Sequence, residues 1–65
     1  MSPATQTREL AAREGDGIQV TLLWRPGDNA HTVSVEDTRV GRWFQLAVAP
    51  DHALDAFYHP YAYAA

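Results

Sequence analysis

The chain has 65 residues, too few for two domains, and a chain of this length buries only about 60% of the surface that its unfolded form exposes. It contains no cysteine, which excludes disulfides and thiolate metal sites as sources of extra stability. The formal net charge of -3 argues against a surface built to neutralise phosphates, so nucleic acid is not the expected partner. Small domains of this kind often gain stability from a partner chain or from self-association.

The sequence predicts no membrane-spanning helix, because it has no run of about 18 apolar residues. Residues 1–14 also lack the apolar stretch of a secretory signal. We therefore expect a soluble, cytoplasmic protein without a membrane partner.

Residues 1–16 are predicted to form a flexible, disordered N-terminal arm. Their one large apolar side chain beyond Met1 is Leu10, which cannot offset the entropy lost on ordering the whole segment. A short helix over residues 7–13 is the alternative, although so short a helix is marginal in water unless it docks. The folded part is therefore expected to be a single β-β-β-α domain over residues 17–65.

Three segments beyond the arm alternate apolar and polar residues, which is typical of half-buried strands. They cover residues 18–25, 30–37 and 42–49. The sequences between them, PGDN at 26–29 and TRVG at 38–41, have the residue types that favour turns. The pattern predicts a three-stranded antiparallel β-meander.

The two turns define a strand register that the apolar pattern can check. The first turn places Leu22 opposite Val33, and the second places Val33 opposite Leu46 and Val35 opposite Phe44. A slip of one residue would move every side chain to the other face of the sheet. The agreement of both turns therefore supports this register, and it predicts Phe44 as a core residue.

Residues 51–58 are predicted to form a C-terminal helix that covers the apolar face of the sheet. Pro60 disfavours a helical conformation of the preceding residue, so we expect the helix to end near Tyr58 and an irregular tail to follow. The fold class is therefore α+β, a three-stranded antiparallel β-meander packed against one helix. At 100° per residue the side of this helix that faces the sheet would comprise Leu54, Phe57, Tyr58 and Tyr61.

Leu23 and Trp43 fall on the sheet face that a single helix would leave uncovered. Large apolar side chains exposed on a small sheet mark contact surfaces, although the N-terminal arm, anchored by Leu10, is an alternative cover. The outer strands at 18–25 and 42–48 contain neither lysine nor an internal proline to block further pairing. We therefore predict a protein partner or a homodimer. The predicted partner-binding residues are Leu23, Arg42, Trp43, Tyr61 and Tyr63.

Catalytic combinations are scarce in this sequence, which has neither cysteine nor lysine. His31, Ser34 and Asp37 resemble a triad in composition, but the odd offset puts Ser34 on the opposite face of its strand from His31. We therefore expect no enzymatic activity, and no small-molecule substrate is identified.

The helix has residue types that bind metals, because His52, Asp55 and His59 would align on its polar side and supply three zinc ligands. Pro60 breaks the helix at the third of these residues, and no fourth ligand is apparent. A solvated helix face explains the same residues, so we predict no metal and no cofactor.

The alternative function is regulatory nucleic-acid binding by Arg39, Arg42 and Trp43, with the aromatic ring stacking on bases. The predicted register places Arg42 opposite Asp37, which favours a surface ion pair instead. Together with the negative net charge, this makes nucleic acid the less favoured partner.

Residues 53–64 read ALDAFYHPYAYA. This segment resembles the C-termini of small actinobacterial proteins in which a short β-rich body precedes an ALDAF-x-HP-x-AYA tail. The resemblance covers the last dozen residues well and the strands loosely. It implies a compact β-rich body with a helix, and it brings no known activity, cofactor or functional residue.

Overall fold

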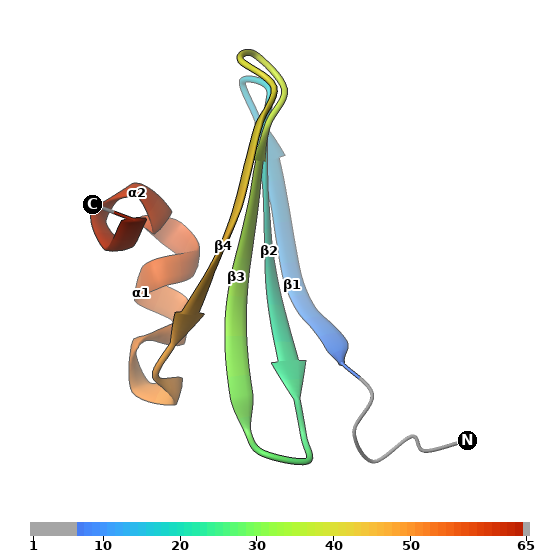
Figure 1. The fold of residues 1–65 in the computed structure, drawn as a ribbon, viewed down its shortest axis with the longest axis vertical. Helices are drawn as coiled ribbons and strands as arrows, with labels where there is room; N and C mark the ends of the chain where they lie inside the picture. The colour runs from blue at the N-terminus through green and yellow to red at the C-terminus, as the bar shows by residue number, and fades with distance from the viewer. Residues whose placement is uncertain (1–6, 65) are drawn as a thin grey trace.

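The computed structural model describes residues 7–64 of the chain. Its strands are antiparallel and lie in one sheet in the same order as in the sequence (Figure 1). They are β1 (Arg8–Gly15), β2 (Ile18–Arg25), β3 (Ala30–Asp37) and β4 (Arg42–Val48). The predicted α+β class with an antiparallel sheet and C-terminal helical structure is confirmed, but the sheet has four strands.

The prediction of three strands behind a disordered arm is wrong, because β1 lies within residues 1–16 and pairs with β2 along its length. The turn between them is Asp16-Gly17, whose φ angles are 55° and 79°. Positive φ at both central residues suits the twist of a tight hairpin, and Asp-Gly favours that geometry. Backbone pairing stabilises such an edge strand even though most of its side chains are exposed. Residues 1–6 of the predicted arm lie outside the described residues.

The predicted register of the other two hairpins is confirmed. β2 pairs with β3 so that Leu22 lies opposite Val33. β3 pairs with β4 so that Val33 lies opposite Leu46 and Val35 opposite Phe44. The apolar side chains that these pairs bring together therefore share one face of the sheet, which we call the helix face.

Helical segments pack on the helix face after β4: η2 (Pro50–His52), α1 (Ala53–Tyr58) and α2 (Pro60–Ala64) (Figure 1). α1 ends where predicted, and His59 leaves the helical conformation with φ of -134° and ψ of 57°. The predicted irregular tail is wrong, because Pro60 opens α2. Proline suits the first turn of a helix, where its missing N–H has no partner to lose. No helix in residues 7–64 is long and apolar enough to cross a membrane.

The core lies between the helix face and α1. Ala53, Ala56 and Phe57 are the buried side chains of α1, and the two alanines allow the helix to approach the sheet closely. Leu54 and Tyr58, predicted to face the sheet, are instead 62% and 59% exposed, so this part of the prediction is wrong. The positions of large apolar side chains did not predict the buried side of α1, because a helix that lies close to a sheet buries small side chains there. The buried apolar strand residues are Val20, Leu22, Val33 and Val35.

Phe44 is half-buried, although the sequence predicts it as a core residue. It packs against the core from β4 together with Leu46 and Val48. β4 has a neighbouring strand on one side only, so all three side chains keep part of their surface exposed. Apolar surface therefore remains along this edge of the sheet.

Candidate interaction surface

The face of the sheet opposite the helices, which we call the open face, has no helix over it in the described part of the chain (Figure 1). β1 extends the sheet sideways and does not lie across this face. Strand alternation gives the open face mainly small or uncharged polar side chains. Away from β1 and the strand ends, the open-face residues are Gln19, Thr21, Leu23, Thr32, Ser34, Glu36, Trp43, Gln45 and Ala47.

Trp43 and Leu23 both lie on the open face, as predicted, but they do not form one patch. Trp43 is 61% exposed on β4 and lies opposite Glu36. Leu23 is half-buried on β2, between Glu9 and Thr32. Two strand spacings and several residues along the strand separate them, or about 16 Å. Trp43 is therefore the more exposed of these two predicted binding residues.

Arg42 lies on the helix face and so points away from its neighbour Trp43. It is opposite Asp37 in the register, but the predicted ion pair between them is wrong. Asp37 instead pairs with Arg39, whose Nη2 lies 2.8 Å from Oδ2 of the carboxylate. The Arg42 guanidinium lies over the ring of Phe44, 5.7 Å from its centroid. Arg42 therefore covers part of the apolar surface beside β4.

Tyr61 and Tyr63 of α2 are tied to the body of the protein by their hydroxyl groups. Tyr61 donates to Asp37 at 3.3 Å, and its ring meets Phe44 edge-on at 5.7 Å between centroids. Tyr63 donates to Asp55 at 2.6 Å, and this hydrogen bond raises the pKa of the Tyr63 hydroxyl. The predicted binding residues thus divide between the two faces: Leu23 and Trp43 on one, Arg42, Tyr61 and Tyr63 on the other.

Asp37 is the buried charged residue at the centre of a polar cluster. Arg39 donates to it from its backbone N–H and from both Nε and Nη2, and Tyr61 adds a further hydrogen bond. These bonds, led by the Arg39 side chain, lower the pKa of Asp37 from 3.8 to about 2. The cluster fixes the turn after β3 and holds α2 against the sheet.

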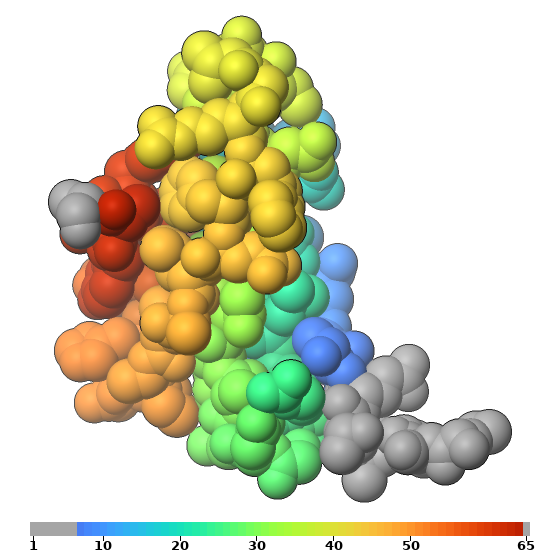
Figure 2. All heavy atoms as spheres, in the orientation of Figure 1, coloured from blue at the N-terminus to red at the C-terminus, as the bar shows by residue number. Residues whose placement is uncertain are grey.

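β4 forms a free edge of the sheet, since no strand in residues 7–64 pairs with its outer side. In Figure 2 its gold atoms lie at the front of the molecule, with the orange and red C-terminal helices to one side. Its pairing with β3 is regular, and its seven residues include neither lysine nor proline. Arg42 is its one charged residue. Such an edge offers unpaired backbone donors and acceptors to an incoming strand.

β1 forms the other edge of the sheet, and its register shifts between Glu9 and Ala11, which marks a bulge. Arg13 anchors the strand to α1 by donating from Nε to the carbonyl of Phe57 at 3.1 Å and from Nη2 to that of Tyr58 at 3.2 Å. Bulges and charged side chains both oppose the addition of a further strand. The charged residues of β1 are Arg8, Glu9, Arg13 and Glu14.

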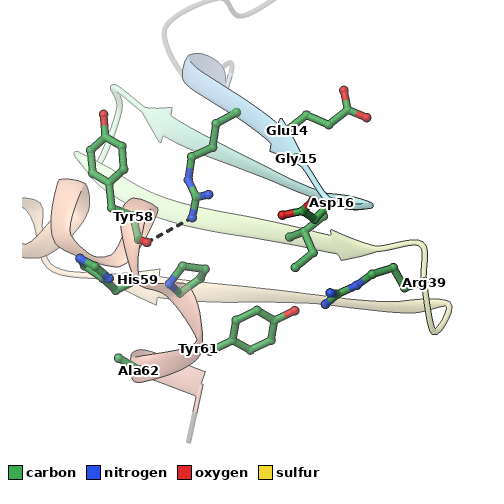
Figure 3. A pocket seen from close by; sticks show the side chains of 11 residues that line it. Glu14, Gly15, Asp16, Arg39, Tyr58, His59, Tyr61 and Ala62 are labelled. Atoms are coloured by element: carbon green, nitrogen blue, oxygen red, sulfur yellow. Dashed lines mark hydrogen bonds between the residues drawn. The ribbon is translucent and has the colours of Figure 1, made fainter.

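A cleft of about 640 Å³ lies between the β1–β2 turn and the helices (Figure 3). Its charged walls include Arg13 and Arg39, which already bond to helix carbonyls and to a carboxylate, respectively. Glu14 and Asp16 also line it, so the formal charges of these four residues cancel. The cleft therefore lacks the charge bias that would favour a small anion or cation.

Comparison with protein-family models, curated proteins and solved structures gave no significant match. Function must therefore be inferred from the surface of this chain itself. The sequence prediction missed two features of that surface: the anchoring role of Arg13 and the difference between the two edges. The Asp16-Gly17 turn was the signal that would have revealed β1 and, with it, both features.

The residues considered for catalysis or metal binding do not come together. Ser34 lies on the open face, whereas His31 and Asp37 lie on the helix face. Within residues 7–64 no three histidine, cysteine or acidic side chains are placed to hold a metal ion, and Asp55 accepts a hydrogen bond from Tyr63. The β4 edge with Trp43 therefore remains the surface with the clearest functional character.

Proposed function

We propose that this protein is a small, non-enzymatic protein–protein interaction module, and that it binds its partner by strand addition to β4. The observation that carries the proposal is a regular, unprotected edge strand whose tryptophan is 61% exposed. In strand addition the backbone hydrogen bonds supply affinity, while side chains alternating along the edge supply specificity.

The exposed side chains around β4 suit this role. Trp43 offers a large, rigid anchor on the open face, and tryptophan is enriched among residues that dominate binding energy. Arg42 and Tyr61 border Phe44 on the helix face, so a partner strand would contact both sides of the edge. Leu23 and Tyr63 lie farther from the edge and would contact a larger partner.

Nucleic-acid binding by Arg39, Arg42 and Trp43 has weaker support. Arg39 is committed to Asp37 through a two-point ion pair. Arg42 and Trp43 lie on opposite faces of the sheet, so they would not meet the same stretch of nucleic acid. The net charge of -3 also works against phosphate binding.

The experiment that tests this proposal is affinity capture with three immobilised proteins: the wild type, Trp43→Ala and Leu10→Ala. Leu10 is the matched control, because it is a large apolar residue that is 51% exposed on the other edge strand. A partner that uses β4 should be retained by the wild type and by Leu10→Ala and lost from Trp43→Ala. Hydrogen exchange on the purified complex should then show slower exchange of the β4 amides.

Capture that is equal for all three proteins would contradict the proposal, as would slower exchange confined to β1 or the helices. Loss of binding in Leu10→Ala alone would move the binding edge to β1.

A further inference from the structure

We infer that the strand added to β4 is β4 of a second copy of this chain, antiparallel to the first, with Gln45 opposite Gln45 of the second copy. The inference rests on the proposed function, because both use the same edge. It adds the identity of the partner, the symmetry of the complex and the register.

The geometry of β4 allows a closed, symmetric pairing. The strand has seven residues with Gln45 at its centre, so a two-fold axis through that position pairs every residue of one strand with a residue of the other. Two such strands form a ladder about 24 Å long with about six to eight backbone hydrogen bonds between the chains. The result is one continuous sheet of two copies.

On the open face this register places large side chains opposite small ones. Trp43 lies opposite Ala47 of the second copy, and the symmetry repeats that contact on the other side of the axis. Both residues are exposed in the single chain, so the indole can lie against a methyl group without displacing another side chain. The two Gln45 side chains meet as neutral amides that can bond to each other.

On the helix face the same register places Phe44 opposite Leu46 of the second copy. Both residues are half-buried in the single chain because β4 has no outer neighbour. Pairing would cover their remaining apolar surface, and aromatic–aliphatic pairs across strands are favourable. The second copy therefore supplies the neighbour that these side chains lack.

The charges of β4 also fit this arrangement. Arg42 lies opposite Val48 of the second copy, which keeps the two Arg42 side chains about 20 Å apart and avoids like charges across the ladder. Pairing of β4 with β1 of another copy would instead be head-to-tail and would propagate as a filament. The bulge between Glu9 and Ala11 and the charges of β1 oppose that alternative.

The test places a charge on the symmetry axis and compares it with the same charge elsewhere on the open face. Gln45→Glu and Gln45→Lys each set like charges opposite each other in a homodimer, whereas a mixture of the two variants sets opposite charges there. Gln19→Glu and Gln19→Lys are the matched controls, because Gln19 is an exposed open-face glutamine on the inner strand β2. Dimerisation would be measured by sedimentation from low to high micromolar concentration.

The expected result is a wild-type dimer whose dissociation constant rises about tenfold or more in either Gln45 variant. The equimolar mixture of the two variants should return close to the wild-type value, and the Gln19 variants should change little. A second measurement does not depend on charge. The chain has no natural cysteine, so Gln45→Cys should give a disulfide-linked dimer on mild oxidation, whereas Gln19→Cys should not.

A wild type that stays monomeric at high micromolar concentration would overturn this inference. If Trp43-dependent capture of another protein persists in that case, the proposed function stands without self-pairing, and if no such capture is seen, both fail. A wild-type dimer that is insensitive to Gln45 but weakened by the Gln19 variants would overturn the edge pairing in favour of stacked open faces.

Discussion

The two edges of the sheet, β1 and β4, both expose a large apolar side chain, yet they differ in what surrounds it. Leu10 is 51% exposed on a strand with a bulge and four charged residues. Trp43 is 61% exposed on a regular strand with one charged residue. The exposure of a large apolar side chain therefore does not by itself distinguish an edge that can accept another strand from one that opposes it. Backbone regularity and neighbouring charge decide it, because an incoming strand needs an unbroken ladder and must not bury unpaired charges.

The two edges are also held in different ways. β1 is fixed to α1 by Arg13, which bonds to two carbonyls at the C-terminal end of that helix and lies over the rings of Phe57 and Tyr58. β4 is fixed by its register with β3 and by the Phe44 contact with α2. A side chain therefore links the charged edge strand β1 to a helix, whereas the edge strand β4 keeps apolar surface exposed to solvent.

The largest expected effect is that of Phe57→Ala, which removes the core ring beneath Arg13. Phe57 is 3% exposed, so truncation should cost about 3 to 5 kcal/mol, close to the whole stability of a domain this small. Urea denaturation should find the variant largely unfolded. Phe44→Ala on β4 is the control, and it should cost less because that ring is half-exposed. A larger loss of stability in Phe44→Ala than in Phe57→Ala would contradict the difference in burial between the two rings.

Trp43→Ala should separate binding from stability at the β4 edge. We expect its free energy of unfolding to stay within about 1 kcal/mol of the wild type, since the side chain is mostly exposed. Any complex that uses Trp43 as an anchor should weaken by about 2 kcal/mol or more. Thermal unfolding of dilute protein and titration of the complex measure the two quantities. Unfolding of the isolated variant would mean that the indole is packed within the chain.

Arg13→Ala should loosen β1 without disturbing β4. The loss of two hydrogen bonds to helix carbonyls should cost about 1 to 2 kcal/mol and speed hydrogen exchange of the β1 amides. Arg8→Ala is the matched control, because it removes the same charge from the same strand and residues 7–64 show no hydrogen bond from the Arg8 side chain. If Arg8→Ala and Arg13→Ala lowered the stability and sped the exchange of the β1 amides equally, the effect would come from the loss of charge and not from the hydrogen bonds of Arg13.

The last effect concerns pH and the Asp37 cluster, which holds α2 beside β4. The pKa of Asp37 is lowered from 3.8 to about 2, so the folded state favours the ionised carboxylate. That stabilisation should be complete above about pH 4 and should be lost as the pH falls towards 2. Asp37→Asn should flatten this part of the stability curve, as measured by urea unfolding across that pH range. If the free energy of unfolding of the variant fell with pH as steeply as that of the wild type, other carboxylates would be responsible for the loss of stability in acid.

Much of this fold could be predicted from the sequence. Leu22 opposite Val33 and Val35 opposite Phe44 followed from apolar alternation and turn chemistry, and both are local properties of the chain. The exposure of Trp43 followed from the same alternation, because its neighbour Phe44 had to face the core. The end of α1 before Pro60 followed from backbone sterics.

Other features were decided by the tertiary structure. β1 has one large apolar side chain, Leu10, so its sequence lacks the apolar alternation that predicts a strand. It forms a strand because its backbone pairs with β2 and because Arg13 donates hydrogen bonds to carbonyls of α1. Asp37 pairs with Arg39 rather than with Arg42 because the turn folds Arg39 back onto the carboxylate. Alternation along the chain assigns each side chain to a face, but the partner that a polar group or a strand edge meets depends on which distant segments the fold brings beside it.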